Sequence, residues 1–307
     1  MSKIMKLTPS FKDYIWGGNK LMAEYGVKDM DRVAEAWVLS AHPDGPSYLP
    51  DGTTFAEALK NADLGAKAAS FKDFPQLIKL IDAQSDLSVQ VHPSDEYALA
   101  NENQFGKTEM WYIVDATEDA RLVYGLKDGL DSDDLAAAVD EGRIGETVKY
   151  VPVKTGETYF IPAGLLHAIG AGILIAEIQQ NSDLTYRAYD FDRVGKDGKP
   201  RELHIQKALD VTRPYTEDEI RAIRFERGET AEKGELLANS KYFKVSRLKV
   251  SGEESLYVSP DSFMHLLCVA GEGSIIFEGE SYPVKWGDSY FLPAGMGELT
   301  VSGDMTV

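Results

Sequence analysis

The sequence predicts a mainly β fold of antiparallel sandwiches or barrels with a few interposed α-helices. Short apolar or alternating runs bounded by Gly, Pro and Asp recur along most of the chain, which is typical of strands. One phrase also occurs twice, as GETYFIPAGLLHAIGAG at 156–172 and as GDSYFLPAGMGELTVSG at 287–303. This duplication predicts two barrels of one type in a single chain.

The strand and helix predictions follow in chain order. Strand-like runs lie at 75–83, 86–93, 109–116, 120–126, 146–153, 157–164, 172–180, 242–250, 254–260, 263–279 and 288–295. Helices are predicted at 54–62, 94–103, 132–142 and 202–212, the first three from Ser, Thr or Asp at their starts. The charged stretch 214–236 is interpreted as a connection, so the chain divides into 1–235 and 236–307.

Composition narrows the function classes. The formal net charge of −18 argues against binding nucleic acid or anionic membranes. No apolar run is long enough for a membrane span, and the N-terminus lacks the features of a secretory signal. The one cysteine, Cys268, is predicted to be a buried strand thiol. We therefore expect a cytoplasmic protein, and the sequence indicates no obligate protein partner.

The repeated phrase has a structural meaning. Gly156 and Gly287 are expected at turns, the Tyr-Phe-aliphatic segment enters a strand, and Pro-Ala-Gly ends that strand. The pattern G-[DE]-x-x-[YF]-[IL]-P-A-G-x-x-H resembles a half-motif of the cupin family of small jelly-roll β-barrels, in which the final His binds a metal. The first copy has His167 at this point and the second has Glu298. We expect a metal in the first barrel and none in the second.

Other residues supply partners for His167. Gln90 and His92 lie two apart in a predicted strand, so their side chains share a face. Glu109 stands at the head of the next predicted strand. Two imidazoles, a carboxylate and an amide oxygen can hold Zn²⁺ and leave room for water or substrate, although Fe, Co and Mn accept the same ligands. His42, next to Pro43, is expected to be structural.

Six segments together resemble the type I, zinc-dependent mannose-6-phosphate isomerase family in its short bacterial form. They are FKDYIWGGNKL, EAWVLSAHPDGPS, LSVQVHPSDEYA, GKTEMWYIV, YFIPAGLLHAIGAG and EIQQNSDLTYRAYDF. The resemblance implies an aldose–ketose isomerase that interconverts mannose 6-phosphate and fructose 6-phosphate through a cis-enediol. It implies one Zn²⁺ per chain, held by His92, Glu109 and His167 with Gln90 as fourth ligand. It also implies Arg187 as a catalytic residue and Lys107 as a contact of the substrate phosphate.

Some choices stay open at this level. The base that moves the proton could be Glu177, Asp183 or a metal-bound hydroxide. Two rival functions also remain, namely another metal-dependent cupin enzyme, such as an iron-dependent oxygenase, and a non-catalytic cupin that binds sugar phosphate. An oxygenase has no need of Lys107 and Arg187, and the intact metal set together with Arg187 argues against a non-catalytic binding protein.

Overall fold

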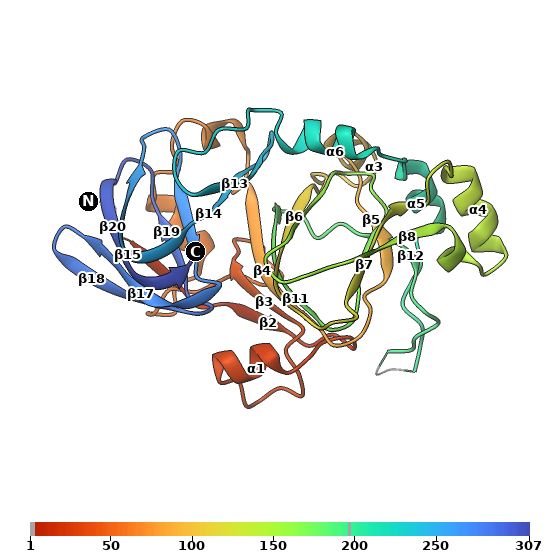
Figure 1. Ribbon diagram of the computed structural model, residues 1–307, viewed down its shortest axis with the longest axis horizontal. Coiled ribbons are helices and arrows are strands. Elements are labelled where there is room, and N and C mark those ends of the chain that lie inside the picture. The colour runs from red at the N-terminus through yellow and green to blue at the C-terminus, as the bar shows by residue number, and fades with distance from the viewer. Residues whose placement is uncertain (1–3, 196–197) are drawn as a thin grey trace.

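The computed structural model describes residues 4–195 and 198–307, and it confirms the mainly β class. The chain forms two halves, each built from antiparallel sheets (Figure 1). Within these described residues, no helix is both long and apolar enough to cross a lipid bilayer.

Two antiparallel sheets make up the first half. The six-stranded sheet has the order β2-β3-β4-β11-β6-β9, with bounds Ser10–Lys12, Glu35–Leu39, Gln76–Ala83, Ile173–Gln180, Glu109–Ala116 and Thr158–Ile161. The five-stranded sheet has the order β12-β5-β10-β7-β8, with bounds Tyr186–Tyr189, Val89–Val91, His167–Ile169, Arg121–Leu126 and Val148–Pro152. The predicted strands between 75 and 180 are all present.

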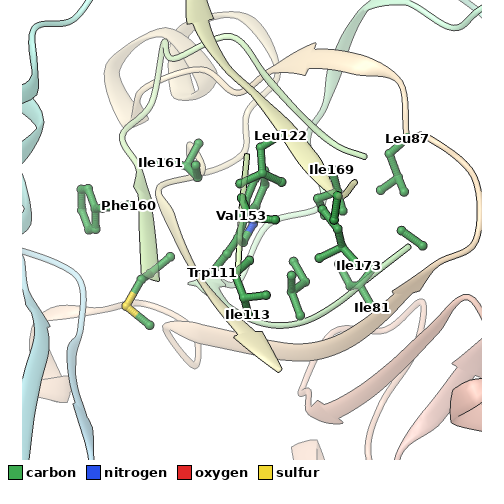
Figure 2. Packing of buried hydrophobic residues seen from close by; sticks show 14 of the residues in the cluster. Ile81, Leu87, Trp111, Ile113, Leu122, Val153, Phe160, Ile161, Ile169 and Ile173 are labelled. Atoms are coloured by element: carbon green, nitrogen blue, oxygen red, sulfur yellow. The ribbon is translucent and has the colours of Figure 1, made fainter. Parts of the chain in front are cut away.

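Side chains from both sheets meet in one apolar cluster (Figure 2). Trp111 and Ile113 of β6 are fully buried there, as is Leu122 of β7 in the other sheet. Ile169 of β10 joins them at 3% exposure. The hydrophobic effect therefore holds the two sheets face to face.

The second half repeats this arrangement on a smaller scale. Its sheets have the orders β1-β19-β16 and β15-β20-β17-β18, with a β13-β14 hairpin before them. The bounds are Met5–Leu7, Ser289–Leu292, Met264–Leu267, Lys249–Val258, Gly297–Thr306, Ala270–Phe277, Glu280–Lys285, Glu235–Asn239 and Lys244–Arg247. Cys268 is buried in its core, as predicted, but it directly follows β16 and does not lie within a strand. Burial raises the pKa of its thiol to about 11.

The first strand of the chain, β1, joins the two halves. β1 pairs with β19, so residues 5–7 belong to a sheet of the C-terminal half. Phe291 of β19 packs with Phe55 and Phe74 in an apolar cluster that also contains residues of β3 and β4. The division of the chain at residue 235 remains a prediction, and this exchange of β1 shows that the halves are not independent along the sequence.

Each predicted helix has a counterpart, and the sequence missed two. The helices are α1 Lys20–Tyr25, α2 Phe55–Ala58, α3 Asp95–Asn101, α4 Ser132–Asp140, α5 Ile205–Val211 and α6 Glu217–Arg224, with short 3₁₀ turns at Leu59–Asn61, Ala68–Ser70 and Ile144–Glu146. α1 and α6 were not predicted. Asp131, not Ser132, caps α4, because the Asp131 carboxylate accepts from the free N–H groups of the first turn.

The repeated phrase builds the same local structure twice. Gly156 (φ 91°) and Gly287 (φ 78°) adopt the left-handed turn conformation, which confirms their predicted role. The strands β9 and β19 follow them, and β10 and β20 start after each Pro-Ala-Gly. His167 is fully buried in β10, whereas Glu298 of β20 is exposed. The two copies therefore share the same local backbone structure, but His167 faces the protein interior and Glu298 faces solvent.

Candidate metal centre

Three ligand candidates converge from three strands of the first barrel. His92 directly follows β5, Glu109 is the first residue of β6, and His167 is the first residue of β10. In the sheet register His167 lies directly opposite Gln90 of β5, so the two side chains share the interior face. We call His92, Glu109 and His167 the metal triad.

The geometry of the metal triad fits a bound cation. His92 Nε2 lies 3.6 Å from Glu109 Oε2, and His167 Nε2 lies 3.5 Å from Glu109 Oε1. Donors bound at about 2.1 Å to one tetrahedral ion lie roughly 3.4 Å apart, so these separations suit a shared metal. The three residues are at most 1% exposed; neither Nε2 atom nor Glu109 Oε1 has a hydrogen-bond partner, and Lys107 is the ion-pair partner of Glu109 Oε2. Buried polar atoms left this way are costly unless something binds them.

Backbone carbonyls set the orientation of both imidazoles. His92 Nδ1 lies 2.9 Å from the Leu184 carbonyl oxygen, and His167 Nδ1 lies 2.8 Å from that of Leu165. A carbonyl at this distance requires the proton on Nδ1, which leaves Nε2 with a lone pair directed at the centre. This is the tautomer that a metal ligand needs.

Burial adjusts the charges of the metal triad. It lowers the pKa of His167 to about 4 and, with Lys107 and His167 nearby, lowers the pKa of His92 well below its usual value. Both imidazoles are therefore neutral at pH 7. Burial, followed by the neighbouring Glu177 carboxylate, raises the pKa of Glu109 to about 8. A bound cation would reverse that shift by favouring the carboxylate.

A buried ion-pair network adjoins the metal triad. Lys107 Nζ lies 2.9 Å from Glu109 Oε2 and 4.0 Å from Glu177 Oε2, and Lys79 Nζ lies 3.5 Å from Glu177 Oε2. Trp111 Nε1 donates to Glu177 Oε1 at 3.1 Å. Although burial raises the pKa of Glu177, Lys107 and Lys79 outweigh it and hold this pKa below its usual value. Glu177 is thus an ionised carboxylate inside the barrel, and its Oε2 accepts no hydrogen bond.

Arg187 lies on the same interior face, one strand from Gln90. The register pairs Arg187 of β12 with Gln90 of β5. Arg187 Nε donates to Ser88 Oγ at 3.3 Å, and Ser88 Oγ donates to Gln90 Oε1 at 3.1 Å. Arg187 Nη1 donates to the Glu202 carbonyl oxygen at 2.8 Å. Both groups that accept hydrogen bonds from the Arg187 guanidinium here are neutral, so the positive charge of Arg187 is available to a substrate.

The sequence analysis missed two residues of this interior. Ser88 precedes Gln90 and His92 at the same spacing of two, so the strand periodicity could have revealed it. Lys79 interrupts the apolar strand β4 and is 6% exposed. A lysine in such a strand is rarely buried without an ionic partner, and this rule could have predicted a carboxylate opposite it. Glu177 is that partner, directly across in β11.

That the second half holds no metal remains a prediction. Among the described residues, one other group of possible metal donors is close enough to bind an ion, and it consists of His42, Asp44 and Asp183. It is half-exposed, with His42 Nε2 3.8 Å from Asp183 Oδ1, and it too belongs to the first half. Glu298 is in neither group.

Metal binding is expected to release protons in a pH-dependent way. Before a cation binds, the Glu109 and Glu177 carboxyls together hold about one proton near pH 7. A divalent cation requires Glu109 as a carboxylate, so its binding should release close to one proton at pH 7 and almost none at pH 9. Metal affinity should accordingly rise with pH between these values. Calorimetry in buffers of different ionisation enthalpy measures the release, and zero release at pH 7 would contradict the raised pKa of Glu109.

Comparison with known proteins agrees with this geometry. Residues 4–125 match the family model "Phosphomannose isomerase type I, catalytic domain", and residues 232–307 match "Mannose-6-phosphate isomerase, cupin domain". The mannose-6-phosphate isomerase ManA of Bacillus subtilis is 38% identical over 96% of this chain and 94% of its own. The mannose-6-phosphate isomerase of Streptococcus mutans is 34% identical over 100% of this chain and 98% of its own.

Solved structures show the same similarity. A crystal structure of mannose 6-phosphate isomerase from Bacillus subtilis superposes with a TM-score of 0.88 at 34% identity, over 100% of this chain and 98% of that one. A putative mannosephosphate isomerase from Archaeoglobus fulgidus, 22% identical over 100% of this chain and 96% of its own, shares the fold with a TM-score of 0.78. The predicted cupin fold and family are confirmed, and the chain belongs to the type I phosphomannose isomerase family.

Proposed function

We propose that this protein interconverts mannose 6-phosphate and fructose 6-phosphate and that it uses one Zn²⁺ per chain. The observation that carries the proposal is the metal triad, whose buried Nε2 atoms and Glu109 Oε1 lack hydrogen-bond partners and which adjoins an ionised carboxylate and two lysines. An aldose–ketose isomerase needs such a combination, because it must polarise a carbonyl and move a proton between two adjacent carbons.

The metal would be held by His92, Glu109 and His167, with the Gln90 amide oxygen as fourth ligand. Gln90 is supported by its position opposite His167 on the interior face. When bound, Zn²⁺ supplies Lewis-acid polarisation of the oxygens on substrate carbons C1 and C2. Imidazole and carboxylate ligands at these separations suit zinc, and the family is metal-dependent.

We assign the proton transfer to Glu177 rather than to Asp183. Glu177 is 3% exposed, ionised and directed into the network, whereas the Asp183 side chain is 43% exposed and lies 3.8 Å from His42. A carboxylate shielded from water can take the proton from one carbon and return it to the other without losing it to solvent. Burial lowers the pKa of Lys79, but Glu35 and Glu177 outweigh burial and raise this pKa. Lys79 is therefore a charged partner that keeps Glu177 in place.

Arg187 is proposed to stabilise the negative charge that develops on the substrate oxygens. Its replacement with lysine keeps a charge but loses the planar donor fork. We expect Arg187→Lys to lower kcat about 10-fold and Arg187→Ala about 100-fold, with metal content unchanged. Steady-state kinetics and metal analysis on the same samples test this. A loss of metal in Arg187→Ala would show instead that Arg187 supports the centre through Ser88 and Gln90.

Lys107 is proposed to bind the substrate, at its phosphate. Removing a phosphate contact raises KM for mannose 6-phosphate more than it lowers kcat. We expect Lys107→Ala to reduce kcat/KM for mannose 6-phosphate by about 100-fold and to change any turnover of unphosphorylated mannose far less. Equal losses with the two sugars would place Lys107 at the reacting end, beside Glu109 Oε2, rather than at the phosphate.

The rival functions have direct tests. Purified protein should convert mannose 6-phosphate into fructose 6-phosphate, which a coupled assay detects. An oxygenase would consume dioxygen, and a non-catalytic binding protein would bind the sugar phosphate and form no product. Detection of fructose 6-phosphate without dioxygen uptake supports the proposed isomerase.

A further inference from the structure

The chain between two residues of the metal triad forms a closed loop. Residues 93–108 leave the end of β5 after His92 and return to the start of β6 at Glu109. The Lys107 N–H donates to the Pro93 carbonyl oxygen at 3.0 Å. A Cβ at Gly106 would lie 2.4 Å from the Ser94 carbonyl carbon, so the loop closes too tightly for a side chain there. The spacing of His92 and Glu109 therefore depends on how this loop closes.

Asp95 joins the parts of this closure. Its Oδ1 accepts from the Gly106 N–H at 3.0 Å and from Gln180 Nε2 at 2.9 Å. Its Oδ2 accepts from the Tyr242 hydroxyl at 2.8 Å. Gln180 in turn accepts from the buried Thr108 N–H through Oε1, at 2.8 Å. The Asp95 carboxylate thus holds Gly106, the residue before Lys107, directly. It holds Thr108, the residue before Glu109, through Gln180.

The Tyr242 contact reaches this loop from the C-terminal part of the chain. Tyr242 lies in the turn between β13 and β14, and it is separated from Asp95 by 147 residues. Phe243, the next residue, packs on Phe160 in the core of the first half. α3, which begins at Asp95, lies at the same end of the barrel as α6 (Figure 1). The hairpin therefore contacts the loop that carries Lys107 through Tyr242.

We propose that Asp95 is a positioning residue, which sets the separation of His92 and Glu109 and so the affinity of the centre for its metal. The inference rests on the proposed metal site. Groups that orient ligands typically contribute 10- to 100-fold to metal affinity, because a misplaced donor must be moved before it can bind. Asp95 acts on the backbone at 106–109, directly at Gly106 and through Gln180 at Thr108. The Tyr242 hydroxyl holds the Asp95 carboxylate from the other side.

The test compares Zn²⁺ affinity among matched variants, measured by competition with a chromophoric chelator on apo protein. We expect a dissociation constant about 10- to 100-fold higher for Asp95→Ala and a few-fold higher for Tyr242→Phe. Asp95→Asn keeps an oxygen for Gly106 and Gln180 and should stay within a few-fold of wild type. Glu96→Ala is the control, because Glu96 is an exposed acid in the same first turn of α3.

Unfolding of the apo proteins is followed in parallel, because a merely structural residue lowers the unfolding midpoint and leaves the affinity of the folded protein unchanged. That pattern in Asp95→Ala would overturn the inference. If Asp95→Ala does not fold, Gln180→Met breaks the same network from its other side, and wild-type affinity in that variant would overturn it equally. Failure of the wild-type protein to bind Zn²⁺ would instead reject the metal site itself.

Discussion

Alanine at His92, Glu109 or His167 is expected to remove most bound metal and to lower turnover at least about 1,000-fold. Each residue supplies one of three buried donors that lie within 4.8 Å of one another. Loss of one leaves an incomplete coordination shell, and the remaining donors cannot move together to replace it, since backbone carbonyls hold both imidazoles. Metal analysis and mannose 6-phosphate turnover, measured on the same preparations, test this result.

His265→Ala is the matched control for the two histidine variants. His265 is a partly buried imidazole of the C-terminal half whose Nε2 lies 2.8 Å from Ser289 Oγ, and burial lowers its pKa to about 3. Its removal is expected to lower the stability of the fold and to leave metal content at the wild-type level. Full metal occupancy in all three triad variants would reject the site assignment.

Glu177→Gln is expected to lower kcat about 1,000-fold while metal content stays at the wild-type level. Glutamine has the same shape and still accepts from Trp111 Nε1, so the variant removes the basic carboxylate, together with its ion pairs to Lys79 and Lys107, and keeps the side-chain volume. KM should change much less than kcat, because Glu177 acts in the proton-transfer step and not in the binding of the substrate. Transfer of deuterium from C2 of labelled mannose 6-phosphate to C1 of the product, followed by NMR, should slow in proportion to kcat.

Asp183→Asn serves as the comparison for that variant. Asp183 is the other carboxylate that the sequence offers as a base, and it is more exposed and lies close to His42. We expect Asp183→Asn to retain turnover within about 10-fold of wild type. A large loss in Asp183→Asn together with a small loss in Glu177→Gln would transfer the role of base to Asp183.

The metal triad was predictable because its signals are local. The His of the repeated phrase, the spacing of two between Gln90 and His92, and Glu109 at a strand head each depend on a few neighbouring residues. The structure brings the triad together in one buried cluster, whereas the role of Gln90 as a ligand remains a prediction. The strands between 75 and 180 were predictable for the same reason, since alternation and turn residues mark them.

What the sequence did not reveal depends on distant pairing or on competing signals. The ion pair between Lys79 and Glu177 arises because β4 and β11, almost a hundred residues apart, are neighbours in the sheet. The pairing of β1 with β19 is more distant still. α6 was missed for another reason, since its charge suggested a connection. The Thr216–Glu219 capping box was a local signal from which this helix could have been predicted.

The central claim is that one zinc in the first barrel is required for isomerisation. The most direct measurement removes metal from the purified protein with a chelator, returns Zn²⁺ in steps, and follows conversion of mannose 6-phosphate to fructose 6-phosphate. We predict that activity disappears with the metal and recovers linearly until about one Zn²⁺ is bound per chain. Full activity in the metal-depleted protein, or recovery that continues to two Zn²⁺ per chain, would contradict this account.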